Sequence, residues 1–223
     1  YKLVPSSTAC DGTLSYGAMP LGTATDFGSD GSYKVCAKLA DLAGNPPAYG
    51  ATSAFTLKTA LPTFSSLSLA NVASDAWISI TDHASTSALA AGLAASNYDL
   101  AEYKLVQAST SCNGPLTYGA MPQADSSDFT TDGLYKVCAR LSDLAGNPYA
   151  YGATSNMTLK IGQPAFASLA LAGEAADTYL NAAEKLLTSN LVSNAVGLSF
   201  DFADYALVSA CLLYTSDAAD DTP

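Results

Sequence analysis

Histidine and basic residues are scarce in this chain of 223 residues, which has one His and nine Lys and Arg against 20 Asp and Glu. A single imidazole, His83, excludes a multi-histidine zinc site and a repeated Ser–His–acid triad, so we expect His83 to be a surface-loop residue. Nucleic acid is a polyanion that requires clustered cations, and it is not an expected partner of a chain with net charge −11. No hydrolase, P-loop or dinucleotide motif occurs, and we expect no catalysis and no required cofactor in this chain.

Long hydrophobic runs are also missing. No apolar stretch of about 18 residues is present, so no membrane insertion is expected within this segment. The apolar fraction is nevertheless 49% and the charged fraction only 13%. A chain of this composition can fill real cores, and it predicts ordered globular protein with an acidic, solvated surface.

Cysteines are few and regularly spaced. Apart from Cys211, they form two pairs with identical separation, Cys10 with Cys36 and Cys112 with Cys138. Metal-binding cysteines usually occur as close couplets, and no such couplet occurs here. One disulfide within each pair is the economical interpretation, and it predicts an oxidising compartment, either extracellular or at a cell surface.

The dominant feature of the sequence is an internal repeat with a period of 102 residues. Residues 1–58 and 103–160 are identical at 39 of 58 positions without an insertion or deletion. Such self-similarity marks a tandem array, and this period is the size of a small domain. We therefore predict the C-terminal part of one repeat at 1–60, a complete repeat at 61–162 and the N-terminal part of a third at 163–210.

The end of the chain departs from the repeat. The third copy follows the second through Tyr205 and Val208, but Cys211 then falls three positions before the place of the expected cysteine, which is Tyr214. From Cys211 onward the residues resemble one reading frame of a sequencing adapter. We therefore predict that residues 211–223 are a non-native artefact tail.

Short alternating apolar runs, separated by turn residues, predict an all-β sandwich. The strands expected in the complete copy are 64–69, 87–95, 103–107, 134–141 and 150–160. The Ala content of the second run also permits a helix. A turn is expected over the Asp-Leu-Ala-Gly-Asn-Pro run that follows the fourth strand.

The alternation in the fourth strand also places its cysteine. Val137 and Leu141 fall on one face, whereas Lys136, Cys138 and Arg140 fall on the opposite face. The disulfide is therefore expected outside the core, as an external staple for the long loop before this strand. Closing a loop of this size contributes about 3–4 kcal/mol in the chain-entropy model.

Two segments of the repeat resemble a known family. Residues 30–45 and 132–147 each contain an Asp-Gly turn, an aromatic residue, an alternating strand and a closing Asp-Leu-Ala-Gly-Asn, as in the penultimate strand of bacterial Ig-like repeats. Residues 75–79 and their copy 177–184 resemble the opening of the same repeats. The resemblance covers residues 1–210 and implies tandem Ig-like domains of large surface proteins, often adhesins, with neighbouring repeats as partners. The cysteine pair departs from the commonest, cysteine-free members.

The repeated acids suggest a calcium hypothesis. If the turn before the penultimate strand of one domain faces the hairpin turns of the next, Asp30 would approach Asp99 and Asp143, and Asp132 would approach Asp201. Calcium prefers six to eight oxygen ligands, which such a junction can supply. The alternative is that each Asp caps its own turn through a bond to a following backbone N–H.

Two further alternatives concern function. Five tyrosines form either a carbohydrate-stacking strip or ordinary packing beside the sandwich: Tyr16, Tyr49, Tyr118, Tyr149 and Tyr151. The first functional hypothesis is a structural stalk or display segment of a secreted or surface-attached bacterial protein. The competing hypotheses are a module that binds a glycan or a host surface protein, and an accessory array of a secreted hydrolase.

Overall fold

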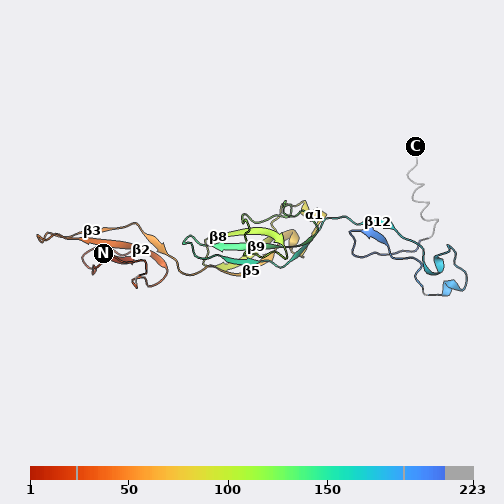
Figure 1. Cartoon of the computed structure of the whole chain (residues 1–223), viewed down its shortest axis with the longest axis horizontal. Helices are drawn as coiled ribbons and strands as arrows, with labels where there is room; N and C mark the ends of the chain where they lie inside the picture. Colours follow the sequence, from red (N-terminus) through yellow and green to blue (C-terminus); the bar gives the residue numbers. More distant parts are fainter. Residues whose placement is uncertain (24, 188, 209–223) are drawn as a thin grey trace, which may run out of the picture. The chain divides into compact units, whose positions relative to one another are not determined.

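The computed structural model describes residues 1–23, 25–187 and 189–208, and strands dominate it (Figure 1). The chain divides into two compact units, Tyr1–Leu159 and Lys160–Pro223. The all-β prediction is confirmed. The strands are β1 (Lys2–Pro5), β2 (Gly31–Leu39), β3 (Ala48–Ala51), β4 (Phe55–Leu57), β5 (Thr63–Leu69), β6 (Trp77–Ser79), β7 (Ala90–Ser96), β8 (Leu100–Gln107), β9 (Gly133–Ser142), β10 (Ala150–Ala153), β11 (Met157–Lys160), β12 (Ala165–Ser168) and β13 (Val196–Leu198).

The larger sheet of the complete copy is built around β9. β8 pairs antiparallel with β9 from Leu100 opposite Ser142 to Gln107 opposite Tyr135. β10 and then β11 pair with the other edge of β9, and β6 follows β11. β9 is therefore paired along both edges and is the central strand of this sheet.

The strand expected at 150–160 is divided by a local irregularity. Ala153 pairs with Cys138 and Met157 pairs with Tyr135, so three residues on one strand oppose two on the other. Thr154, which is buried, fills this break: its N–H donates to the Val137 carbonyl and its Oγ1 accepts from the Val137 N–H, both at 3.0 Å. A hydroxyl thus replaces one bond of the ladder at the bulge.

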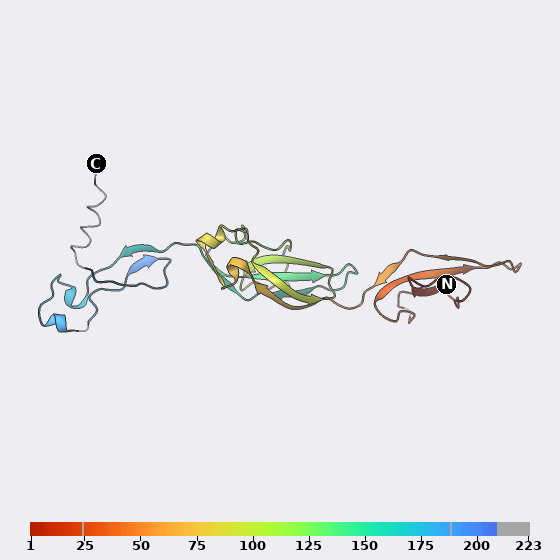
Figure 2. The ribbon, with the colours of Figure 1, turned by 180° about the vertical axis from the view of Figure 1, so that it is seen from behind.

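The smaller sheet consists of β5 and β7, paired from Thr63 opposite Ser96 to Leu69 opposite Ala90. It packs on the larger sheet through Phe64, whose ring lies over Gly152 of β10. A Cβ at Gly152 would come within 2.2 Å of the Phe64 ring, so this close approach requires glycine. Figure 2 shows the two sheets of this copy from behind. The core between them is built from Leu67, Ile78, Leu105, Tyr135, Val137, Leu141, Met157 and Leu159.

The expectation for His83 is wrong. Ser79 and Asp82 form a reciprocal capping box that starts a short helix, α1 (Ile80–His83), so His83 ends a helix instead of lying in a loop. Its ring is half-buried and packs edge-on against Phe129, and Nε2 lies 3.0 Å from the Phe129 carbonyl. The preceding strand β6 was not expected either, because three residues are too few to show an alternation.

The two flanking copies repeat the local structure of the complete one. β2 pairs Cys36 with Ala51 as β9 pairs Cys138 with Ala153. β12 and β13 pair Phe166 with Gly197 in the register of Phe64 with Ala95, and Ser199 repeats the positive φ of Asn97. The short 3-10 helices Asn71–Ala73 and Gly173–Ala175 also correspond. A third, Glu184–Leu186, lies in the last copy. The 102-residue period is therefore structural.

The expected boundaries at 60 and 162 stay predictions, since the observed division separates only residues 1–159 from the remainder. The predicted artefact tail, 211–223, lies outside the described residues. Among the described residues, no helix is long and apolar enough to cross a membrane.

Candidate functional site

Both predicted disulfides are present. Cys10 with Cys36 and Cys112 with Cys138 each have a Cα–Cα distance of 5.4 Å. Cys138 pairs with Lys104 across the ladder, so it lies on the face opposite to the one that Val137 turns to the core. The bridge is therefore outside the space between the two sheets, as predicted.

The bridge lies outside the main core but is not exposed to solvent at Cys138, which is fully buried. The loop that the disulfide tethers folds back over it and forms a small apolar cluster with Val106, Leu116, Tyr118 and Tyr151. The alternation identified the face, but it could not show that the loop covers this face. The bridge thus closes a second, minor core.

Two tyrosines of the complete copy pack against one guanidinium. Arg140 lies with its Cζ 4.9 Å from the Tyr118 ring centroid and 5.0 Å from that of Tyr149. Its other partner is Glu102, at 2.6 Å. Burial raises the pKa of Tyr118, whose hydroxyl donates to the Cys112 carbonyl. These contacts hold the loop against β9 on the disulfide face.

These rings do not form a flat strip. Tyr118 and Tyr149 are inclined to Tyr151 by 49° and 77°, and in the first copy Tyr16 is inclined to Tyr49 by 40°. Tyr118 is buried, while Tyr149 remains 53% exposed. Within this group, Tyr149 is the side chain of the complete copy that is best placed to meet a ligand.

The linker before the complete copy is the most strongly organised polar site. Lys58 Nζ lies 2.7 Å from Asp99 Oδ2, and the Lys58 carbonyl accepts from Asn147 Nδ2 at 2.9 Å. Asp30 accepts from the N–H of Thr59 at 2.8 Å, from its hydroxyl at 2.6 Å and from the N–H of Ala60 at 3.0 Å. We call residues 58–60 and these partners the junction.

Three of the predicted calcium ligands lie at the junction. Asp30 and Asp99 bind the linker directly, and Asp143, which we include in the junction, binds Asn147. Hydrogen bonds are the main cause of the lowered pKa of these three carboxyls. The main donor is Thr59 for Asp30, Lys58 for Asp99 and Asn147 for Asp143. The charge of Lys58 also lowers the pKa of all three carboxyls. Lys58 was missed by the sequence reasoning, although its recurrence as Lys160 was a usable signal.

The remaining acids lie at equivalent points of the repeat. Asp201 pairs with Lys160, as Asp99 pairs with Lys58. Asp132 precedes Gly133 at the start of β9. In the described part of the chain, no three His, Cys, Asp or Glu side chains are grouped so that they could hold a metal ion. Calcium binding stays a prediction.

Turn chemistry accounts for much of this arrangement. Asp143 accepts from the N–H and the amide of Asn147 at 3.0 and 2.7 Å, and Asp41 repeats this with Asn45 at 3.1 and 2.6 Å. Gly146, directly before Asn147, has φ of 80°, a conformation that favours glycine. The Asp-Leu-Ala-Gly-Asn run is therefore a self-capped turn, which in the complete copy also presents Asn147 to the linker.

Comparison with known proteins adds no relative. No family model, no curated protein and no solved structure matches the chain.

Proposed function

We propose that this chain is a structural segment of a large secreted or surface-attached bacterial protein, an adhesin-type stalk of tandem Ig-like domains. The single observation that supports this most is the junction. Side chains on either side of residues 58–60 satisfy the polar groups of the linker, and the lysine–aspartate pair recurs one period later. A linker held in this way orders consecutive domains without a core of its own.

The chemistry of the copies is consistent with a passive, durable role. The complete copy closes its own apolar core, and a disulfide ties its longest loop to the central strand. Such a domain resists unfolding and proteolysis outside the cell, where reducing agents are scarce. Length and resistance then constitute the function, and any adhesive tip lies elsewhere in the parent protein.

Limited proteolysis with trypsin tests the junction. We expect the bond after Lys58 to be cleaved much more slowly in the native chain than the bond after Lys185. A protease cleaves segments that open locally, and Lys185 lies in an exposed single-turn 3-10 helix, whereas residues 58–60 are held by Asp30, Asp99 and Asn147. The double variant Asp30→Asn, Asn147→Ala should accelerate cleavage after Lys58 and leave cleavage after Lys185 unchanged. Equal rates at both sites in the native chain would contradict an ordered linker.

A second candidate function, glycan or protein binding, is favoured by one observation. Tyr149 is exposed and stands beside Arg140, which combines an apolar ring with hydrogen-bond donors. A glycan array probed with the whole chain tests it. Binding that Tyr149→Ala abolishes and Tyr179→Ala preserves would favour recognition over a purely structural role.

A further inference from the structure

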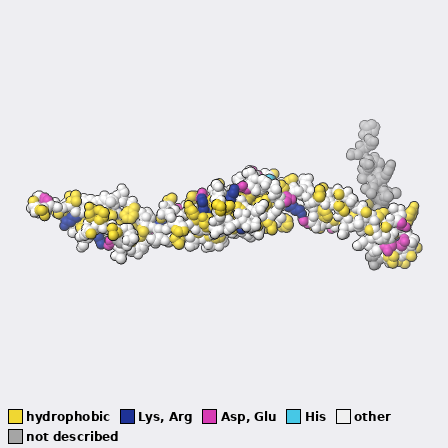
Figure 3. Space-filling view, in the orientation of Figure 1, with side chains coloured by type: hydrophobic (Ala, Val, Ile, Leu, Met, Phe, Trp, Pro, Cys, Tyr) yellow, Lys and Arg dark blue, Asp and Glu magenta, His cyan; other side chains and the backbone are white. Residues whose placement is uncertain are grey.

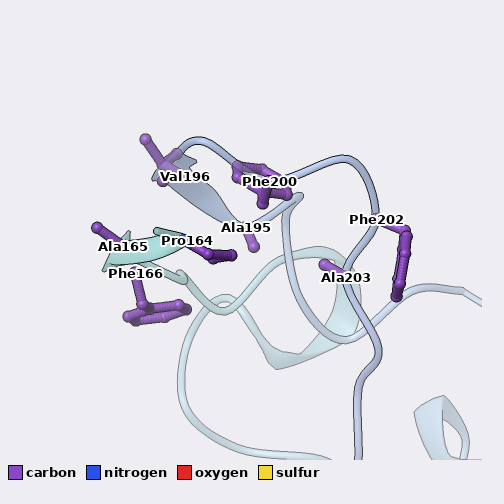
Figure 4. A pocket seen from close by; sticks show the side chains of 9 residues that line it. Pro164, Ala165, Phe166, Ala195, Val196, Phe200, Phe202 and Ala203 are labelled. Atoms are coloured by element: carbon purple, nitrogen blue, oxygen red, sulfur yellow. The ribbon is translucent and has the colours of Figure 1, made fainter. Parts of the chain in front are cut away.

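The turn at residues 111–114 of the complete copy brings together three groups that can react with one another. The apolar groove of the last copy has no such chemistry, since it is lined only by alanine, glycine, proline, valine and phenylalanine (Figure 4). In the turn, the Ser111 hydroxyl donates to Asn113 Oδ1 at 2.6 Å, and the backbone N–H of Gly114 follows directly in the chain. The Asn113 side chain is exposed to solvent. A nucleophile, an electrophilic carbon and an activating donor therefore lie within one turn.

Asn113 is the one asparagine of the chain that a glycine follows. Glycine has no Cβ, so its backbone nitrogen can approach the preceding side chain closely. Asn45 and Asn147 precede proline, which has no N–H. The Asn71 amide nitrogen is held by the Ala88 carbonyl at 2.8 Å. Among the described residues, no acceptor binds the corresponding amide nitrogen of Asn113, which is therefore free to leave.

The backbone N–H of Gly114 is weakly held. It donates to the Ser111 carbonyl at 3.4 Å, at the long limit of a hydrogen bond, and this bond closes the turn. The Gly114 carbonyl, in contrast, accepts from the Leu116 N–H at 2.8 Å. A short, exposed turn closed by such a bond opens at little cost in free energy, and the Gly114 nitrogen is then available for reaction.

We propose that Asn113 is a deamidation site, at which the Gly114 nitrogen attacks Cγ of the asparagine side chain. The Gly114 amide proton is lost to solvent hydroxide, and a bond forms between this nitrogen and Cγ. The bond between Cγ and Nδ2 then breaks, and Nδ2 takes a proton from water and leaves as ammonia. The Ser111 hydroxyl favours the attack, because it donates to Oδ1, where negative charge develops. The product is a cyclic imide.

Water opens the imide at either of its two carbonyl carbons. Cleavage between Cγ and the Gly114 nitrogen leaves an aspartate in an unchanged main chain. Cleavage of the former peptide bond between residues 113 and 114 leaves an isoaspartate, in which the main chain runs through the side-chain carbons and is longer by one methylene group. Both products carry a carboxylate in place of a neutral amide.

The first copy shows that the repeat accommodates an aspartate at this position. Asp11, one period before Asn113, also precedes a glycine. Its Oδ1 accepts from the Thr13 N–H at 2.9 Å and from the Thr13 hydroxyl at 2.6 Å. In the complete copy Pro115 replaces Thr13, and Ser111 supplies the hydroxyl instead. The aspartate product thus keeps a donor for its new carboxylate.

The isoaspartate product has a different consequence, because Asn113 directly follows Cys112. The Cys112 carbonyl accepts from the Tyr118 hydroxyl, and the Tyr118 ring centroid lies 4.9 Å from Arg140 Cζ. A methylene group added to the main chain between Cys112 and Tyr118 displaces these contacts and loosens the loop. Charged side chains are sparse on the surface that Figure 3 shows, so either product also changes the local charge.

Peptide mapping of the full chain tests the site. The chain is incubated in mildly alkaline buffer, reduced and digested with trypsin, and peptide 105–136 contains Asn113 as its only asparagine. We expect this peptide to gain the mass of an amide-to-acid exchange, which fragmentation assigns to residue 113. Isoaspartate formation at Asp132 leaves the mass unchanged and does not interfere. The folded chain should react within about tenfold of the rate of the urea-unfolded chain, because an exposed turn opens readily.

Gly114→Ala is the matched control. An added Cβ lies 3.4 Å from the Ser111 carbonyl oxygen, an ordinary contact that leaves the turn in place. The methyl group hinders the backbone nitrogen and should slow deamidation roughly tenfold or more. Asn113→Asp reproduces the aspartate product and should unfold at the native temperature, as followed by Trp77 fluorescence. The isoaspartate form, separated by chromatography, should unfold at a lower temperature.

Two results overturn the proposal. The first is a folded chain in which peptide 105–136 keeps its mass while the urea-unfolded chain is converted, which would show that the fold protects Asn113. The second is deamidation of Gly114→Ala as fast as that of the native chain, which would rule out attack by this backbone nitrogen. Neither result depends on the junction, so the proposed structural role is tested separately.

Discussion

Lys58 Nζ lies 2.7 Å from Asp99 Oδ2, and one period later Lys160 pairs with Asp201. The lysine ends one copy, and the aspartate lies 41 residues further on, in the next copy. A partly exposed ion pair contributes little stability by itself. Its importance here is positional, because the same lysine also supplies the carbonyl that Asn147 binds.

The junction carboxyls predict a pH dependence. Asp30, Asp99 and Asp143 have folded-state pKa values below the ordinary value of about 3.9. A lowered pKa stabilises the fold above the ordinary value, and this stability is lost as pH falls through the folded-state pKa. We therefore expect the melting temperature of the complete copy to fall as pH decreases from about 5 to below 3.

Asp143→Asn should flatten this pH profile, because the self-capped turn no longer titrates. Asp204→Asn, a surface change outside the junction, should leave the slope as it is. Melting is followed by circular dichroism at constant ionic strength. A profile that is equally steep in Asp143→Asn would show that the loss of stability arises elsewhere.

Lys58 and calcium predict different responses to added metal. If Lys58 is the cation of the junction, millimolar Ca²⁺ should leave the melting temperature of the native chain unchanged. Lys58→Ala removes the positive charge near three carboxyls, and we expect this variant to gain stability with Ca²⁺ and lose it with a chelator. A calcium-dependent gain in the native chain would show instead that calcium is a junction ligand.

The disulfide of the complete copy is expected to be a major source of its stability. Cys112→Ala with Cys138→Ala should lower the free energy of unfolding by about 3–4 kcal/mol, because the loop closed by the bridge becomes free in the unfolded chain. The chain has a single tryptophan, Trp77, so urea unfolding followed by its fluorescence reports on this copy.

The matched control for the disulfide removes the other bridge. Cys10→Ala with Cys36→Ala should leave the Trp77 transition in place, since that bridge lies in the first copy. If both double variants shift the transition equally, the two copies unfold as one cooperative unit.

Gly152 provides a packing prediction. Gly152→Ala places a methyl group within 2.2 Å of the Phe64 ring and should destabilise the complete copy by about 1–3 kcal/mol. Gly50→Ala is the matched control, because the same substitution meets no atom there within 4 Å. A double-mutant cycle with Phe64→Ala should show coupling to Gly152 and none to Gly50.

The strand predictions succeeded where alternation was long. β9 and its two faces follow directly from the pattern of Tyr135, Val137, Lys136 and Cys138, since side chains alternate with a period of two. β5, β8 and the pairing of the cysteines could also be predicted from the sequence. β7 begins three residues later than expected, because small residues do not mark a strand end.

The shortest elements could not be predicted from the sequence, because they contain too few residues to show an alternating or helical pattern. β6 and α1 have three and four residues, and they exist because β11 offers an edge and Ser79 and Asp82 cap each other. The division of 150–160 depends on Thr154 meeting Val137, a contact between residues 17 apart in sequence. Such features follow from tertiary pairing and leave no local signature.

The sequence by itself determined the period, the strand-rich class, the faces of β9 and the cysteine partners, because these depend on spacing and alternation along the chain. Only the tertiary structure decided that the loop after Cys112 buries the bridge, that Phe64 requires Gly152, and that Lys58 stands among the predicted calcium ligands. Each of these is a contact between segments distant in sequence. It is fixed by how two sheets and a linker meet in space, which no local pattern encodes.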